Sequence, residues 1–304
     1  MTNFIKSWKF FSFSVLFLVF FFATGSFYQA QVLASAKGLS LKEVQLALRP
    51  DRNPDAMLRS RELLEAELRK NLGVSVKVVV PSSAAIIQQA LLNKTLDLAF
   101  VSATDCLLGI KAGSAEPLLA AKVRGQTSYQ SIWLVRHDSP YQSLVELKNK
   151  PIVFSSRTST SGYLVPWAHL IKQGLIKQKQ SPENFFGRRS VSFGTGYVSA
   201  VERLLQGQAE AAAVSDYVYD LNQHLSPEQK AKLRVLVRQG PVPTHLMVVR
   251  SGVSADDRQI LRRALQALPE HLTSELFSGP LVEVEASKHL APLEEVFSLT
   301  GAKN

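Results

Sequence analysis

Residues 76–101 read VKVVVPSSAAIIQQALLNKTLDLAFV. Two short apolar runs, Val76–Val80 and Leu96–Val101, enclose a stretch with helical periodicity at Ala84–Leu92, and this alternation predicts a β-α-β unit. A strand at Val44–Leu48 and a helix ending at Leu72 come before it, which extends the unit to β-α-β-α-β. Because the same alternation continues along the chain, we expect an α/β fold.

The loops that follow these strands hold polar and charged residues. Arg49 follows the first strand, Ser83 follows the second, and the third is followed by Ser102, Thr104 and Asp105. Ligands of open α/β sheets bind at the carboxyl ends of the strands, so all five are candidate ligand contacts. Arg49 could clamp an oxyanion through two hydrogen bonds, although a solvated loop arginine fits the sequence equally well. Asp105 could accept a hydrogen bond from a protonated phosphate or an amino group of the ligand, or it could be a capping or surface carboxylate.

A second α/β unit begins near residue 131. Its expected elements are strands at 132–135, 152–154, 190–193 and 211–214 and a helix at 197–205. A further strand at 246–249 follows the sequence Gly240-Pro-Val-Pro243. The polypeptide should therefore leave the first unit near 124–131 and return to it near 240–247.

This path predicts two lobes joined by a double crossover hinge, a geometry that closes on ligands. Lobe 1 should comprise residues 37–130 and 241–304, and lobe 2 should comprise residues 131–240. Two segments in which a strand runs into an arginine, 134–137 and 248–251, are interpreted as candidate crossovers.

A hydroxyl-rich loop stands at a predicted helix entrance in the second unit. Thr158, Ser159, Thr160 and Ser161 precede Gly162 and a helical stretch in which Pro166 indicates either a kink or the true helix start. Unpaired amides and the helix dipole at such an entrance bind a small oxyanion without any lysine, and hydroxyls can converge on the same oxygens. A plain N-cap remains the alternative interpretation.

The segment Ser159–Pro166 resembles the Ser-Thr-Ser-Gly loop of periplasmic phosphate, phosphite and phosphonate substrate-binding proteins that serve ABC importers. Further segments, Asp97–Phe100, Ala211–Asp216 and Pro241–Pro243, are similar to other parts of this family in the same order. The resemblance implies a type 2 periplasmic binding-protein fold, a ligand in the cleft between two lobes, and no catalysis. It also implies that Asp216 is a pocket residue.

Three positions depart from the family pattern. Ser83 and Cys106 stand where family members usually have tyrosines, and Tyr197 stands near a family histidine. The resemblance therefore leaves the ligand open among phosphate, phosphite, a phosphonate or another anion, with Tyr197 as a candidate contact. His245, an isolated histidine in an apolar pattern, is interpreted as structural.

The first 36 residues have the features of a secretory signal peptide. Lys6 and Lys9 precede an apolar run, Phe10–Ala23, which is shorter than the roughly 20 residues that a spanning helix needs. Cleavage is expected at Ala36 or, as a weaker alternative, at Ala30, with export to the periplasm. An uncleaved N-terminal anchor is the other interpretation.

Composition excludes several classes of protein. The chain has 304 residues, is 46% hydrophobic and carries a formal net charge of +10. A single cysteine, Cys106, excludes an intrachain disulfide and multi-cysteine metal sites, and no enzyme motif is present, so we expect no cofactor and no metal ligands. We expect a monomeric binding protein, with no nucleic-acid partner, that captures a small tetrahedral oxyanion for an ABC importer permease. The alternative is a sensor that reports its ligand to a membrane signalling partner.

Overall fold

The structure is a computed structural model that describes residues 38–49, 58–221 and 225–302. The predicted signal peptide, with its cleavage at Ala36 or Ala30, lies outside these residues. Among the helices described, none is both long and apolar enough to cross a membrane.

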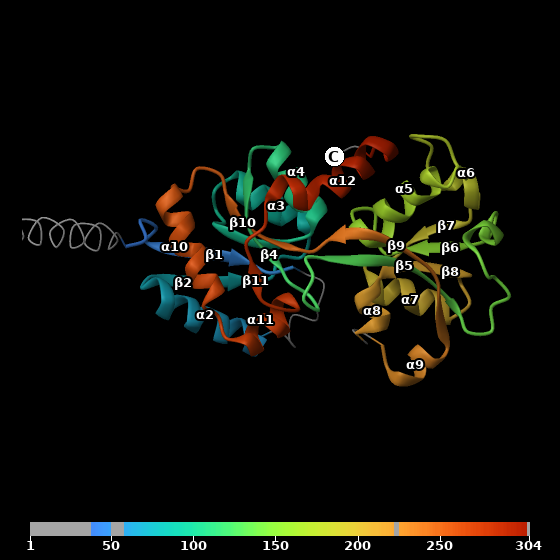
Figure 1. The fold of residues 1–304 in the computed structure, drawn as a ribbon. Coiled ribbons are helices and arrows are strands. Elements are labelled where there is room, and N and C mark those ends of the chain that lie inside the picture. Colours follow the sequence, from blue (N-terminus) through green and yellow to red (C-terminus); the bar gives the residue numbers. More distant parts are fainter. Residues whose placement is uncertain (1–37, 50–57, 222–224, 303–304) are drawn as a thin grey trace, which may run out of the picture. The chain divides into compact units, whose positions relative to one another are not determined.

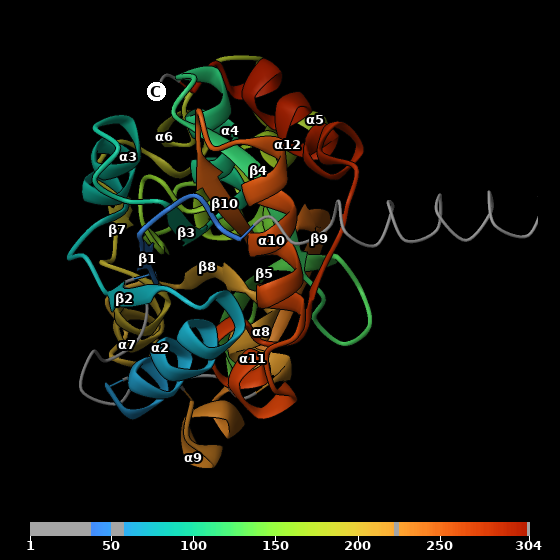
Figure 2. The same ribbon diagram turned by 90° about the vertical axis from the view of Figure 1, so that its left-hand side faces the viewer.

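The first sheet has six strands in the order β11-β4-β10-β3-β1-β2 (Figure 1). Strand β1 pairs in parallel with β2 and β3, whereas β10 runs antiparallel to β3 and β4. The strands are β1 (Glu43–Ala47), β2 (Ser75–Val79), β3 (Leu98–Val101), β4 (Ala115–Ala121), β10 (Leu246–Arg250) and β11 (Leu281–Val282). The helices linked to them are α2 (Leu58–Leu72), α3 (Ala84–Leu92), α4 (Ala103–Lys111), α10 (Ala255–Gln266) and α11 (Glu270–Phe277). Helices α10 and α11 both contact α2, as Figure 2 also shows.

The second sheet has five strands in the order β7-β6-β8-β5-β9. Strand β6 pairs in parallel with β7 and β8, and β5 runs antiparallel to β8 and β9. The strands are β5 (Ser128–Arg136), β6 (Ile152–Phe154), β7 (Val191–Phe193), β8 (Ala211–Ser215) and β9 (Leu233–Pro243). The helical segments are η1 (Leu144–Leu147), η2 (Thr160–Leu164), α5 (Val165–Lys172), α6 (Glu183–Phe186), α7 (Tyr197–Leu205), α8 (Asp216–Asp220) and α9 (Pro227–Ala231).

Both faces of the second sheet are covered, which explains the continuous apolar runs of its strands. On one face Leu134 and Val153 pack in a cluster with Leu204 of α7. On the other face Trp133 lies edge-on to Phe154, with ring centroids 5.5 Å apart. Neighbouring residues of a strand point to opposite faces, so a strand between two helical layers must be apolar at every position.

The chain passes between the two sheets at two places. Residues 122–127 connect β4 to β5, and residues 244–245 connect β9 to β10. The expectation that segments 134–137 and 248–251 form the crossovers was wrong. Leu134 and Val135 pair with strands on both sides inside the second sheet, and Val248 does so inside the first sheet. The two-lobed α/β architecture itself has the expected double crossover.

Helix α12 (Ala286–Thr300) contacts elements of both sheets. Its Glu295 carboxylate lies 2.8 Å from the Lys172 ammonium of α5. The ring of Phe297 lies under the ammonium of Lys111 in α4, 4.8 Å from the ring centroid. The predicted lobe boundaries assign α12 to lobe 1, whereas the structure shows that it also packs against α5 and β9.

Candidate functional site

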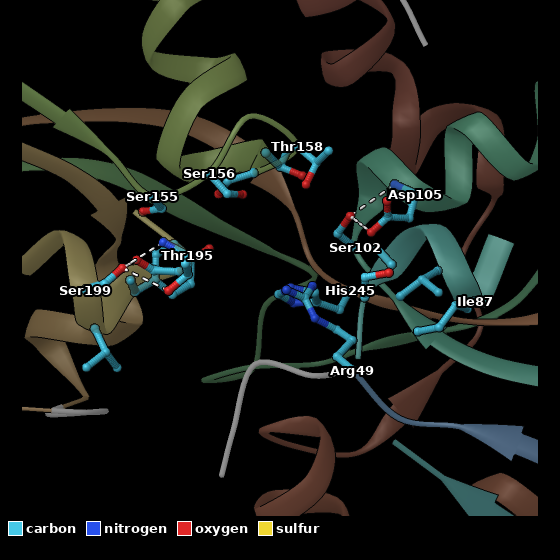
Figure 3. Close-up of a pocket in the computed structure, with 18 of the residues that line it drawn as sticks. Arg49, Ile87, Ser102, Asp105, Ser155, Ser156, Thr158, Thr195, Ser199 and His245 are labelled. Carbon is cyan, nitrogen blue, oxygen red and sulfur yellow. Dashed lines mark hydrogen bonds between the residues drawn. The ribbon is translucent and has the colours of Figure 1, made fainter. Parts of the chain in front are cut away.

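A cavity of about 440 Å³ is lined by residues of both sheets (Figure 3). Most of its wall comes from residues just after the carboxyl ends of β1, β2, β3, β6 and β7, where α/β sheets bind ligands. The lining side chains that can donate a hydrogen bond are Arg49, Ser82, Ser83, Ser102, Tyr129, Ser155, Ser156, Thr158, Ser159, Thr160, Thr195, Tyr197, Ser199 and His245. Asp105 is the one carboxylate among the lining residues of the described chain. The cavity is therefore rich in neutral donors.

The second sheet contributes the hydroxyl loop that follows β6. Thr158, Ser159 and Thr160 line the cavity, and Ser159 is the N-cap of η2, with its Oγ accepting a hydrogen bond from the Gly162 amide at 2.9 Å. Segment η2 is a five-residue π-helix that runs directly into α5, and Pro166 stands in the first turn of α5. Proline lacks an amide hydrogen and is tolerated there, so it marks the start of the α-helix and produces no kink in its middle.

Ser161 supports the loop and is not among the residues that line the cavity, so its contact with a ligand stays a prediction. Its side chain is fully buried, its Oγ lies 2.8 Å from the Tyr197 hydroxyl, and its carbonyl accepts a hydrogen bond from Ser131 Oγ at 2.6 Å. Tyr197 itself lines the cavity from the start of α7. These contacts link the hydroxyl loop to β5 and α7 and thereby hold it in place.

The first sheet presents helix entrances on its side of the cavity. Ser83 caps α3 by accepting from the Ile86 amide, and Ser102 caps α4 by accepting from the Asp105 amide at 3.0 Å. The Ser102 hydroxyl also lies 2.6 Å from Asp105 Oδ2, and it donates that hydrogen bond. Asp105 is thus a helix-start carboxylate that also lines the cavity, and its hydrogen bond to a ligand stays a prediction.

Thr104 is buried and joins the two sides of the site. Its Oγ1 lies 2.7 Å from Oγ1 of Thr160, a contact between α4 and η2. Thr104 is not among the residues that line the cavity, whereas its partner Thr160 is. Next to it, Cys106 is fully buried, and burial followed by the charge of Asp105 raises the pKa of its thiol to about 12. That thiol is therefore a small neutral core group.

Arg49 and two aromatic side chains from the crossover regions complete the wall. Tyr129 stands at the start of β5 and His245 between β9 and β10, and their rings are stacked with centroids 6.1 Å apart. Arg49 and His245 both line the cavity, and both are labelled in Figure 3. Burial raises the pKa of the Tyr129 hydroxyl well above its usual value, so this phenol stays neutral.

Asp216, expected in the pocket, is not among the residues that line the cavity. Its Oδ2 accepts a hydrogen bond from Arg124 Nη2 at 2.6 Å, and the side chain is almost fully buried. Burial raises the pKa of this carboxyl, while Arg124 opposes that shift. Arg124, on the link between β4 and β5, thus pairs with one carboxylate oxygen, and a contact of Asp216 with the ligand stays a prediction.

Several lining residues were not anticipated from the sequence. Ser155, Ser156, Thr195 and Ser199 follow β6 and β7, and applying the carboxyl-end rule to these strands would have found them. Tyr129 and His245 carry no such local signal, because only the pairing of β5, β9 and β10 brings the two crossovers to the cavity. His245 had been interpreted as structural, yet it lines the cavity.

The chain was compared with known families and relatives. The profile of the family described as "ABC transporter, phosphonate, periplasmic substrate-binding protein" matches residues 46–284. The phosphate-import protein PhnD of Mycolicibacterium smegmatis is 28% identical over 181 residues, which are 58% of this chain and 56% of that protein. The probable ABC transporter phosphite binding protein PhnD1 of Prochlorococcus marinus is 24% identical over 202 residues, 64% of this chain and 65% of that one. The matched region thus spans less than two thirds of either relative.

Solved structures share the fold. PhnD1 of Prochlorococcus marinus in complex with methylphosphonate has a TM-score of 0.71 at 18% identity, covering 84% of this chain and 97% of that one. XAC2383 of Xanthomonas citri, bound to chloride ion, has a TM-score of 0.69 at 21% identity, covering 86% and 98%. At these identities the likeness establishes the α/β architecture described above.

Proposed function

Because the chain belongs to the family of phosphonate periplasmic substrate-binding proteins of ABC transporters, we propose that its cavity captures a small tetrahedral oxyanion for import. The candidate ligands are phosphate, phosphite and a phosphonate. Relatives named for phosphate import and phosphite binding, and a structural neighbour that holds methylphosphonate, support this ligand class. The partner would be the permease of an ABC importer, reached in the periplasm after removal of residues 1–36. Members of this family bind substrates and are not enzymes.

One observation carries the proposal: the hydroxyl loop at the start of η2 lines a cavity whose opposite wall holds Ser102 and Arg49. Each hydrogen bond from a neutral donor to an ion contributes about 1.5 to 3 kcal/mol. A tetrahedral oxyanion can accept several at once, so hydroxyls and helix-start amides can offset the cost of removing the ion from water. Among the described lining residues, Asp105 carries a negative charge, which opposes the binding of an anion. The positive charge of Arg49 offsets it.

Ligand binding would be coupled to closure through the double crossover. The Thr104–Thr160 hydrogen bond shows that α4 and η2 can meet directly. An anion held by donors from both sheets makes more contacts when these elements are together. Closure then follows from the greater affinity of the ligand for the closed state.

Calorimetric titration of ligand-stripped mature protein tests the proposal. The panel is phosphate, phosphite, sulfate, methylphosphonate and aminoethylphosphonate. We expect at least one tetrahedral anion to bind, and the double change Ser159→Ala, Thr160→Ala to weaken the best ligand by about 100-fold or more, because two charge-assisted bonds are lost. An unchanged affinity in the double variant would contradict this site.

Ser254→Ala is the matched control. Ser254 caps α10 by accepting from the Asp257 amide at 3.1 Å, just as Ser159 caps η2, but it lies outside the cavity lining. Its loss should cost stability on the order of 1 kcal/mol and leave the affinity unchanged. Comparing the two variants separates the loss of a helix cap from the loss of a ligand contact.

A further inference from the structure

His245 occupies an unusual position in the cavity wall. It lies on the two-residue connection between β9 and β10, one of the two links between the sheets, and it lines the cavity that Arg49 also lines (Figure 3). The Phe100 ring lies at 5.8 Å and the Tyr129 ring at 6.1 Å, measured between centroids, and the Tyr129 ring is nearly parallel to the imidazole at 13°. The imidazole therefore packs against two aromatic rings on the cavity wall.

The groups around His245 differ in whether they change charge near neutral pH. In the described part of the chain, Arg49, Asp105, Tyr129 and Tyr197 share the cavity with it. Burial keeps the pKa of the Tyr129 phenol, and of the Tyr217 phenol stacked on it at 4.6 Å, far above neutrality. Arg124 and Asp216 form an ion pair outside the cavity lining.

The other histidine near this crossover is held away from the cavity. His289 Nε2 lies 3.2 Å from the Thr244 carbonyl, and burial lowers the pKa of its ring. It therefore remains neutral at pH values where an ordinary histidine begins to take up a proton. His245 is the one histidine among the described residues that line the cavity, and an imidazole can be neutral or, with a second ring proton, cationic.

We propose that His245 is a ligand contact whose charge sets the strength of oxyanion binding, so that protonation of its ring adds a second cation to a cavity wall that already holds Arg49, and tightens the complex. This inference rests on the proposed function and deepens it. Binding and protonation are linked reciprocally: a nearby anion makes the ring easier to protonate, and a protonated ring makes the anion bind more tightly. The favoured ligand form is therefore the more highly charged anion, held by Arg49, imidazolium and neutral hydroxyls together.

The test compares wild type with His245→Gln. Dissociation constants for methylphosphonate are measured by calorimetry between pH 5 and pH 8. Both proteins are titrated with the same ligand at each pH. The ionisation of the free ligand therefore cancels in the ratio of the two dissociation constants. We expect wild type to bind about as tightly as the variant at pH 8 and roughly tenfold more tightly at pH 5, the usual strength of one added charge-assisted bond.

His137→Gln is the control, because His137 is exposed and outside the cavity lining. The ratio of its dissociation constant to that of wild type should stay near one at every pH. A flat ratio for His245→Gln, with binding retained, overturns this inference alone. Absence of binding by wild type to every anion of the panel overturns the proposed function as well.

A second measurement needs no variant. Proton NMR of the wild-type imidazole rings, with and without methylphosphonate, gives the pKa of each histidine. Upon ligand addition, the pKa of one ring should rise and the others should stay constant. If no ring responds while calorimetry shows binding, His245 is not a charge-variable contact.

Discussion

Gly162 shows how a single residue shapes the oxyanion loop. A Cβ atom at this position would lie 2.3 Å from Ser155 Oγ and 2.8 Å from Ser159 Oγ. Both hydroxyls are already engaged, since Ser155 donates to the Ala213 carbonyl and Ser159 accepts from the Gly162 amide. The loop can therefore fold back over the end of β6 only when residue 162 has no side chain.

Gly162→Ala should therefore impair both folding and binding. Overpacking of this kind costs about 1 to 3 kcal/mol of unfolding free energy. Displacement of even one donor should weaken the best ligand about tenfold or more. Urea unfolding and calorimetry measure the two effects.

Gly196→Ala serves as the control for that prediction. Gly196 also lines the cavity, but no atom lies within 4 Å of the position that its Cβ would occupy, and its backbone is extended. Its unfolding free energy should stay close to that of wild type. Equal losses in the two variants would show that steric overlap at Ser155 is not the cause.

At the scale of elements, α12 is the helix that joins parts distant in the sequence. It contacts α4 of the first unit and α5 and β9 of the second, and its buried side includes Leu290 and Leu293. Its ion pair with α5, Lys172–Glu295, is exposed. Apolar burial should therefore dominate its contribution to stability, because exposed ion pairs contribute little.

Leu293→Ala should lower the unfolding free energy by about 2 to 5 kcal/mol, because it empties a core position that is 1% exposed. Glu295→Ala, two residues further along the same helix, should cost less than about 1 kcal/mol. Chemical unfolding of both variants checks this. If the two losses were similar, the packing role assigned to α12 would be wrong.

At the scale of the whole molecule, stability should depend on two half-buried histidines. Burial lowers the pKa of His169 and of His289, and Lys172 adds to the effect at His169. In the unfolded chain the pKa of a histidine is about 6.5. Below this pH, the unfolded chain therefore binds more protons at these two positions than the folded protein does. The contribution of the two neutral histidines to the free energy of unfolding is therefore complete above this pH and is lost as the pH falls below it.

Urea unfolding at pH 7.5 and pH 5 tests this linkage. We expect His289→Gln to lose less stability between the two pH values than wild type loses, because one of the two groups no longer titrates. His137→Gln, at an exposed position, should lose as much as wild type. A variant of His289 with the full wild-type loss would contradict the assignment.

The local chemistry of the sequence determined the strands, the helix entrances and the hydroxyl loop. Alternating apolar runs and cap residues act over a few positions, and Thr158–Thr160, Ser83 and Ser102 follow strands that the sequence itself indicates. The family resemblance rests on the hydroxyl loop together with the segments Asp97–Phe100, Ala211–Asp216 and Pro241–Pro243.

Contacts between distant residues decided the rest of the cavity. Arg124 pairs with Asp216 across 92 positions of the chain, and the pairing of β5 and β9 brings Tyr129 and His245 together. Helix α12 likewise reaches α5 through contacts more than 100 positions apart. The local sequence does not indicate which distant residue a charged or aromatic side chain will contact. The burial of these side chains and the distances between them are set only when both sheets have formed.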